Sequence, residues 1–126
     1  NSLYYVSHIE DMISIACAIG EDRNIPNVPM ELSVEMATRI VIRRCWNILK
    51  KAPKISHAVP ELCTNHLIEM CEVLLCKSYP LDKMNRWLGY IQAGLVVHNL
   101  ITVNDERDFT RPIFHKAYKS ENIDIP

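Results

Sequence analysis

The stretch Leu81-Asp-Lys-Met-Asn-Arg-Trp-Leu-Gly-Tyr-Ile-Gln-Ala-Gly-Leu-Val-Val-His98 gives the clearest fold signal in the chain. Its apolar residues recur at intervals of three and four, which is the repeat of a helix with one buried stripe. The sequence therefore predicts an amphipathic helix here, with Ser78 as its N-cap and Pro80 in its first turn. The residues expected in the buried stripe are Leu81, Met84, Leu88, Ile91 and Leu95.

The other positions of this helix hold a dense mixture of polar and aromatic side chains. Successive helix residues lie about 100° apart, which puts Asn85, Gly89 and Gln92 on one face. Arg86 and Tyr90 lie beside that face. Amides and a guanidinium recognise planar hydrogen-bonding groups, aromatic rings stack on them, and a glycine admits a ligand close to the backbone. The pattern therefore predicts a surface that binds a nucleotide base or a phosphate.

The same residues also have an interpretation in which they serve only the fold. In that interpretation Trp87 belongs to the core, and Gly89 and Ala93 allow another helix to pack closely. The polar side chains would then hold the neighbouring loops in place. Both interpretations agree with the spacing, so the sequence leaves them open.

The rest of the chain also shows helical periodicity, interrupted by proline-containing loops. Glycine is scarce, with three residues, and no long segment alternates apolar and polar positions, which argues against a sheet-rich fold. Thr102 is the expected cap of the segment that follows it, and Pro112 is expected to break or kink that helix. The predicted helices cover residues 3–19, 30–52, 60–77, 81–98 and 103–110, with one last turn at residues 113–118.

These elements predict an all-α fold, a compact bundle or orthogonal array of four longer helices plus a short C-terminal helix. At 126 residues the chain fits a single domain over residues 1–126, with a polar tail from about residue 119. The chain begins with Asn1 rather than methionine, and we expect its natural N-terminus to have been trimmed or replaced.

Two sets of charges recur at intervals of four residues. Glu31, Glu35, Arg39 and Arg43 predict a ladder on the solvated face of a helix, in which each pair contributes about 0.2–0.5 kcal/mol. Nearer the C-terminus, Arg107 and Arg111 share a helix face and are expected to clamp a phosphate or a partner carboxylate. The alternative for these two arginines is internal pairing with Asp108 or another carboxylate.

The overall composition limits the class of partner. Hydrophobic residues make up 48% of the chain and charged residues 23%, which is typical of a globular protein. A formal net charge of −1 provides no global attraction to nucleic acid or to an anionic membrane, so we do not expect nucleic acid as the main partner. No uncharged apolar run is long enough to span a bilayer, so we expect no membrane partner.

The five cysteines are an odd number and lie in segments that are predicted to be helical. They favour a reduced protein of the cytoplasm over a disulfide scaffold. Cys63 and His66 are one turn apart, which suits a pair of metal ligands, but no second close pair of cysteine and histidine completes a tetrahedral site. We therefore expect no structural zinc.

Sequence motifs of enzymes are mostly absent. The chain has no phosphate-binding glycine loop, no H-E-x-x-H motif and no nucleophile elbow, so we favour a protein that is not an enzyme and needs no cofactor. Glu69 and Glu72, three residues apart, are the pair that would bind magnesium if the protein were a small nucleotide hydrolase. That activity is the enzymatic alternative.

Two stretches resemble a motif of small bacteriophage-encoded helical proteins. The first is Lys83-Met-Asn-Arg-Trp-Leu-Gly-Tyr-Ile-Gln92, followed by Gly94 and Leu95, which matches the pattern R-W-L-G-[FY]-[VI]-Q. The second is Glu106-Arg-Asp-Phe-Thr-Arg-Pro-Ile-Phe-His115. The resemblance covers residues 81–115, and the chain departs from it at Ala93, where the pattern has glycine. It implies an accessory protein that acts by stoichiometric binding in the cytoplasm of an infected bacterium.

These observations together predict a non-enzymatic phage accessory protein that binds a host factor or sequesters a nucleotide-derived immune signal. A homo-oligomer is compatible with this role, because a helical domain forms pockets readily between subunits. The alternatives are the metal-dependent nucleotide hydrolase and a structural or assembly protein with an aromatic interface. The residues expected to bind the ligand are Asn85, Arg86, Tyr90, Gln92, Arg107 and Arg111.

Overall fold

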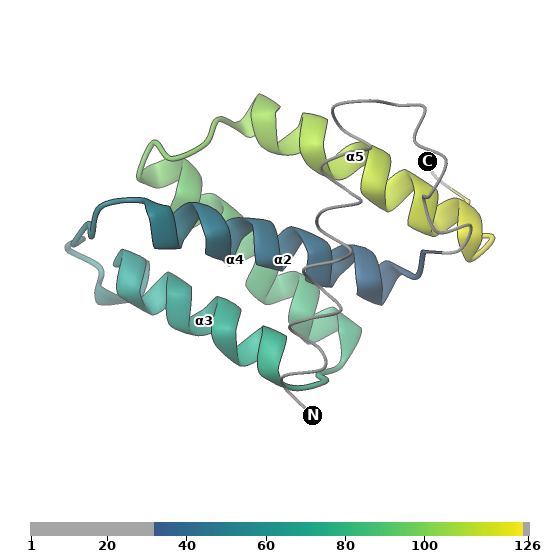
Figure 1. Ribbon diagram of the computed structural model, residues 1–126, viewed down its shortest axis with the longest axis horizontal. Coiled ribbons are helices and arrows are strands. Elements are labelled where there is room, and N and C mark those ends of the chain that lie inside the picture. Colours follow the sequence, from purple (N-terminus) through teal and green to yellow (C-terminus); the bar gives the residue numbers. More distant parts are fainter. Residues whose placement is uncertain (1–31, 125–126) are drawn as a thin grey trace.

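The structure, a computed structural model, describes residues 32–124, and in that part of the chain it contains helices and no strand. The all-α prediction is therefore confirmed for these residues, whereas the helix predicted at residues 3–19, and Glu31, lie outside them. Successive helices run in opposite directions, as Figure 1 shows. The elements are α2 (Val34–Lys51), the short 3-10 helix η1 (Pro60–Leu62), α3 (Thr64–Cys76), α4 (Leu81–Val97) and α5 (Val103–Ser120).

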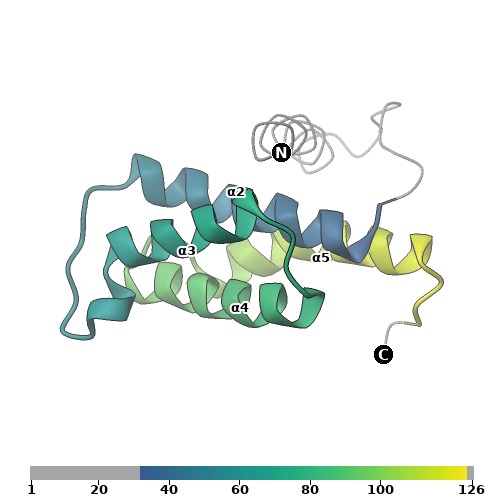
Figure 2. The ribbon, with the colours of Figure 1, turned by 90° about the horizontal axis from the view of Figure 1, so that it is seen from below.

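Helix α2 is the central element and contacts α3, α4 and α5 (Figure 2). It begins at Ser33, whose hydroxyl accepts a hydrogen bond from the backbone N–H of Met36 at 3.0 Å, a standard N-cap. All seven residues from Ala37 to Arg43 are buried, so α2 is covered around its circumference at this level. A helix buried on all sides holds the elements around it in fixed positions.

The burial of α2 contradicts the prediction of a solvated charge ladder. Arg39 and Arg43 are only 5% and 9% exposed: the C-terminal end of α3 packs beside Arg39, and Arg43 lies over the Trp46 ring. The Arg39 guanidinium donates to the carbonyl oxygens of Leu74 and Lys77, each at 3.1 Å, and so satisfies carbonyl groups that the end of α3 leaves open. Glu35 still pairs with Arg39 at 3.4 Å, as the spacing predicts.

Two groups of buried apolar side chains form the core. The larger group joins α2, α3 and α4, and the smaller one joins the N-terminal half of α2 to Ile113 and Ala117 of α5. Four members of the stripe predicted on α4 are buried, but Leu81 is 38% exposed because it is the first residue of the helix. None of the helices within residues 32–124 combines the length and the apolar content needed to cross a lipid bilayer.

Two helices begin later than the proline positions suggest. Pro60 opens η1, but the extended backbone of Cys63 separates this turn from α3, which starts at Thr64. Pro80 occupies the N-cap position of α4 and provides no side-chain cap. The prediction that Ser78 caps this helix is therefore wrong. Tyr79 precedes Pro80, and a residue before a proline is restricted to extended conformations, which keeps Ser78 outside the first turn.

Helix α5 continues through Pro112, so the predicted break and the short C-terminal helix are both wrong. Thr102 does cap the helix as predicted, since its hydroxyl accepts the backbone N–H of Asp105 at 3.0 Å. Pro112 lies on the exposed side of α5, where the carbonyl group of Asp108 that loses its helical partner can bond to water. Ile113 and Ala117 on the opposite side pack against α2 and keep the helix in place.

We expect replacement of Pro112 with alanine to raise the free energy of unfolding by about 1 kcal/mol. Alanine restores the N–H group that a helix interior requires, and it removes the clash of the ring with the preceding turn. Because Asp108 is exposed, only part of the usual proline penalty is present to be recovered. Urea unfolding followed by circular dichroism measures the change, and a lower stability would mean that the packing of α5 depends on the proline.

Candidate functional site

The six residues predicted to bind a ligand lie in different environments on α4 and α5. Asn85 turns toward α2: its amide nitrogen donates to the carbonyl of Leu81 at 3.1 Å, and its amide oxygen accepts the Thr38 hydroxyl at 3.4 Å. Thr38 is completely buried. Part of the hydrogen-bonding capacity of Asn85 is therefore used within the fold.

Gln92 belongs to a polar network that links three helices. Its amide nitrogen donates to one carboxylate oxygen of Glu106 at 2.9 Å, and Arg44 pairs with the other oxygen. Glu106 is only 7% exposed, and the Arg44 guanidinium lies 4.2 Å from the ring centre of Phe109. We call Arg44, Glu106 and Gln92 the Glu106 network; it connects α2, α5 and α4 respectively.

Glu106 lies in the first turn of α5, where an acidic residue is expected from the helix dipole alone. One pattern indicates its buried position: residues 106, 109, 113 and 117 follow one another in steps of three and four, so Glu106 extends the stripe of Phe109, Ile113 and Ala117. A carboxylate in line with an apolar stripe needs a buried partner. That signal could have identified the residue, although it does not identify Arg44.

Arg86 and Tyr90 differ in their access to solvent. The side chain of Arg86 is 73% exposed, and its guanidinium lies 3.8 Å from the Asp82 carboxylate, one helical turn earlier. Such exposed pairs contribute little to stability and exchange readily with other partners. Tyr90 is half-buried and packs against the larger core group. Arg86 is therefore the predicted α4 residue that is most accessible to a ligand.

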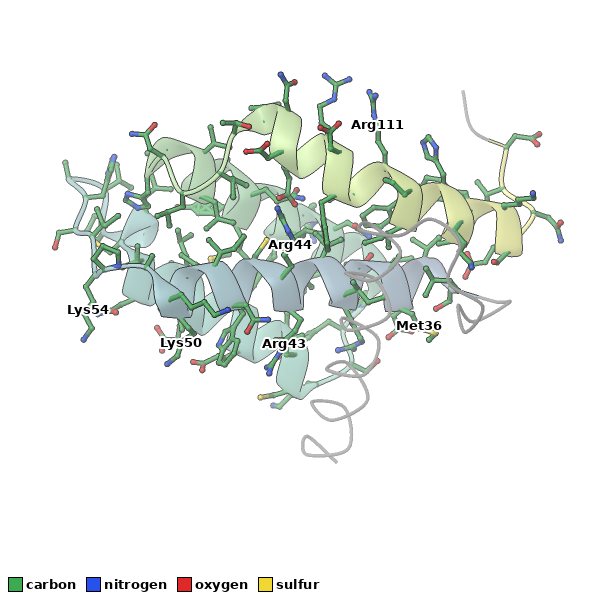
Figure 3. The ribbon with its side chains drawn as sticks, turned by 45° about the horizontal axis from the view of Figure 1, so that its top comes forward. Met36, Arg43, Arg44, Lys50, Lys54 and Arg111 are labelled. Atoms are coloured by element: carbon green, nitrogen blue, oxygen red, sulfur yellow. The ribbon has the colours of Figure 1, made fainter. Side chains whose placement is uncertain are left out.

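Arg107 and Arg111 lie on the outer side of α5, and both are exposed. Figure 3 shows Arg111 pointing away from α2, whereas Arg44 lies between α2 and α5. Within residues 32–124 no ion pair joins Arg107 or Arg111 to Asp108 or to any other carboxylate. The alternative of internal pairing is therefore not observed in this part of the chain.

The two arginines begin a longer row. His115 and Lys119 follow at the same interval of four residues and are also exposed, and we call Arg107, Arg111, His115 and Lys119 the α5 basic row. With a rise of about 1.5 Å per residue, the row extends over about 18 Å along the helix. Like charges four residues apart repel each other, so the row gives α5 no stability of its own. His115 and Lys119 were not predicted as binding residues, although their spacing is visible in the sequence.

The other described arginines have contacts within the chain. Arg39 binds carbonyl oxygens of α3, Arg44 pairs with Glu106, and Arg43 lies over the Trp46 ring at 4.2 Å. Arg86 pairs with Asp82. Arg107 and Arg111 are therefore the arginines of residues 32–124 that make no ion pair or ring contact within that part of the chain.

The C-terminal end of the row borders open hollows in the surface. His115 and Lys119 line them together with Lys116 and Ser120 on one side, and with Asn122, Ile123 and Asp124 on the other. Ammonium and hydroxyl groups in such a position donate hydrogen bonds to carboxylates or phosphates.

Comparison of the chain with protein-family models, with curated proteins and with solved structures finds no match.

The residues considered for metal binding do not come together. Within residues 32–124 no three histidine, cysteine, aspartate or glutamate side chains are placed to hold a metal ion. Glu69 and Glu72 are exposed, and Glu72 accepts a hydrogen bond from the Trp46 indole at 3.2 Å. The Cys63 sulfur accepts the backbone N–H of His57 at 3.3 Å, so it belongs to the loop before α3.

Two buried thiols have strongly altered acidity. Burial is the main reason that the pKa of Cys71 rises to about 12, and the nearby Glu72 carboxylate adds to the effect. Burial likewise raises the pKa of Cys45 well above its ordinary value, with a further contribution from Glu106. Both side chains stay protonated at neutral pH and are poor nucleophiles, since the thiolate is the reactive form.

We therefore expect iodoacetamide to modify Cys76 in the native protein but not Cys45 or Cys71. Cys76 is exposed and serves as the internal reference. The pKa of Cys71 is higher in the folded protein than its unfolded value of about 8.5. The contribution of the buried, protonated thiol to the free energy of unfolding is therefore fully present below about pH 8.5 and is lost as the pH rises toward 12. Peptide mass spectrometry at pH 8 measures the modification, with unfolded protein as the positive control. Rapid labelling of Cys71 would contradict its burial.

Proposed function

We propose that the protein is a non-enzymatic binding protein that recognises an anionic partner through the α5 basic row. One observation carries the proposal: four exposed basic side chains lie at intervals of four residues on α5, and no carboxylate of the described residues pairs with Arg107 or Arg111. The guanidinium group binds carboxylates and phosphates through two parallel hydrogen bonds. A surface of this kind suits binding in a fixed ratio rather than turnover.

The resemblance to small bacteriophage-encoded proteins supports a setting for this activity. Arg107, Arg111 and His115 all lie within the second of the two stretches that resemble those proteins. In that setting the protein would act as a counter-defence factor in an infected bacterium, where it would bind a host factor or a nucleotide-derived signal. Arg86, exposed on α4, is the further residue of the predicted set that is accessible to such a partner.

The first test is charge reversal on the row, with Arg107→Glu and Arg111→Glu introduced together. Lys51→Glu with Lys54→Glu is the matched control, because these lysines are also exposed and Lys54 lies far from Arg111 in Figure 3. Isothermal titration with ATP, inorganic triphosphate and polyglutamate provides probes of both anion types. We expect at least one probe to bind, and the row variant to bind it about tenfold more weakly than the control does.

Added salt should weaken the same binding, since exposed charges are screened within about 8–10 Å. Circular dichroism confirms that both variants remain folded. If no anionic probe binds the wild-type protein, or if both charge reversals reduce binding equally, the proposal is wrong.

A further inference from the structure

We infer that the partner of the α5 basic row is an acidic amphipathic α-helix of another protein, which packs across α5. The inference rests on the proposed function and names the class of its partner. It derives from the geometry of the row, from the residues at its two ends, and from the mismatch of the same surface with other anions.

The spacing of the row corresponds to the spacing of another helix. Positions four residues apart are separated by about 6 Å along any α-helix, so a helix with an acidic residue at every fourth position carries carboxylates at the interval of the row. Side chains four apart also form a ridge inclined to the helix axis. When two such ridges interdigitate, the helices cross at about −50°, which is the commonest packing angle in globular proteins.

An exposed apolar side chain lies near each end of the row: Val103 on the helix, and Ile123 just beyond the end of α5, where it lines a hollow with His115 and Lys119. Val103, four residues before Arg107, is 56% exposed, and Ile123, four residues after Lys119, is 45% exposed. Protein interfaces commonly combine arginine with exposed apolar side chains of this kind. An amphipathic helix offers both carboxylates and apolar residues, whereas a free phosphate offers no group that would contact Val103 or Ile123.

The row is a poor match for a small molecule or a single-stranded nucleic acid. Small-molecule sites are concave and enclose most of the ligand. Arg111 instead projects from the convex outer side of a helix (Figure 3), and the hollows beside His115 and Lys119 are open to solvent. Single-stranded nucleic acid requires exposed aromatic rings on which its bases can stack. The aromatic residues of α5 are instead packed against the core groups; they are Phe109, Phe114 and Tyr118.

Charge also disfavours pairing of α5 with the α5 of a second copy of the chain. In a two-fold symmetric antiparallel pairing of α5 with itself, residues near the middle of the row face their own copies, so Arg111 would oppose Arg111. Asp105 and Asp108 are the exposed acids of the helix, and they are fewer than its basic residues. The row therefore requires a partner with an excess of negative charge.

The decisive experiment uses the full chain and labelled peptides of about twenty residues, long enough to form helix in water. The first peptide has glutamate at every fourth position beside an apolar stripe, and the second contains the same residues in an order that scatters the glutamates around the helix. A third peptide carries lysine in place of each glutamate of the first. Fluorescence anisotropy measures binding to the wild-type protein and to the two charge-reversal variants described above.

We expect the first peptide to bind the wild-type protein about tenfold more tightly than the scattered peptide does. Arg107→Glu with Arg111→Glu should lose this binding and should gain binding of the lysine peptide, while Lys51→Glu with Lys54→Glu should change neither. The exchange of partner charge shows direct contact, because a variant that merely unfolds gains no partner. Shifts in the amide resonances of α5 on peptide addition locate the contact.

Other outcomes separate this inference from the proposed function. If ATP or a single-stranded oligonucleotide binds through the row and the acidic peptide does not, the acidic-helix partner is wrong while the anion-binding function stands. Equal binding of the two glutamate peptides would overturn the helical match as well. If no anionic probe of any kind binds, both the inference and the proposed function fail.

Discussion

Replacing Glu106 with alanine is expected to lower the free energy of unfolding by about 3 kcal/mol, because one partner is removed from a buried ion pair. The substitution leaves the Arg44 guanidinium without its carboxylate in a site where that side chain is only 19% exposed. Gln92 loses its hydrogen-bond acceptor at the same time. Equilibrium unfolding in urea, followed by circular dichroism, measures the loss.

A double-mutant cycle with Arg44→Ala shows whether the network is the cause. Once Glu106 is absent, removal of Arg44 eliminates an unpaired charge, so the double variant should be about as stable as either single variant. Independent effects that add together would contradict the pairing of Arg44 with Glu106. Glu61→Ala is the control for the loss of an exposed carboxylate and should change the stability by less than about 0.5 kcal/mol.

The second large effect is a contrast between two glycines of α4. Gly94→Ala should lower the free energy of unfolding by about 2 kcal/mol, whereas Gly89→Ala should raise it by about 0.5–1 kcal/mol. A Cβ atom at Gly94 would lie 2.6 Å from Cδ1 of Leu67, which is completely buried and has little room to shift. At Gly89 the same atom would meet nothing within 4 Å, so only the gain in helix propensity remains.

The contrast tests the packing directly, because the same change is made twice in one helix. Thermal and urea unfolding of the two variants should give shifts of opposite sign. When Gly94→Ala is combined with Leu67→Ala, the loss of stability should be smaller than the sum of the two single losses, since the shortened side chain removes the clash. Shifts of the same sign for both glycines would show that α3 and α4 do not approach as closely as described.

The helices were predictable from the sequence because their signal is local. The interval of three and four residues fixes which side of α4 is apolar, and Met84, Leu88, Ile91 and Leu95 are buried accordingly. One of the two interpretations of the α4 surface placed the close packing at Gly89 and Ala93, but nothing lies within 4 Å of a Cβ atom at Gly89. The choice among neighbouring helix positions depends on where α3 lies. The structure assigns this role to Gly94.

The contacts of charged residues were predicted less well than the helices. A spacing of four residues is found both in ion pairs within one helix and in residues that bind another helix. An interval of four residues gives Arg39 a partner in Glu35, but it does not reveal that α3 ends beside the same guanidinium. Gln92 was chosen as a ligand-binding residue, while its partner Glu106 is fourteen positions away and belongs to another helix. Arg107 and Arg111 are exposed, as their helical positions opposite Ile113 and Ala117 predict.

The Glu106 network also fixes the rotation of α5 about its own axis. Apolar contacts through Ile113 and Ala117 hold the helix against α2 but tolerate small rotations, whereas the directional bonds from Arg44 and Gln92 to one carboxylate restrict them. Glu106 precedes Arg107 directly, so the direction in which the outer arginines point is set by a bond on the inner side. The orientation of an exposed, adaptable surface is thereby determined in the interior of the protein.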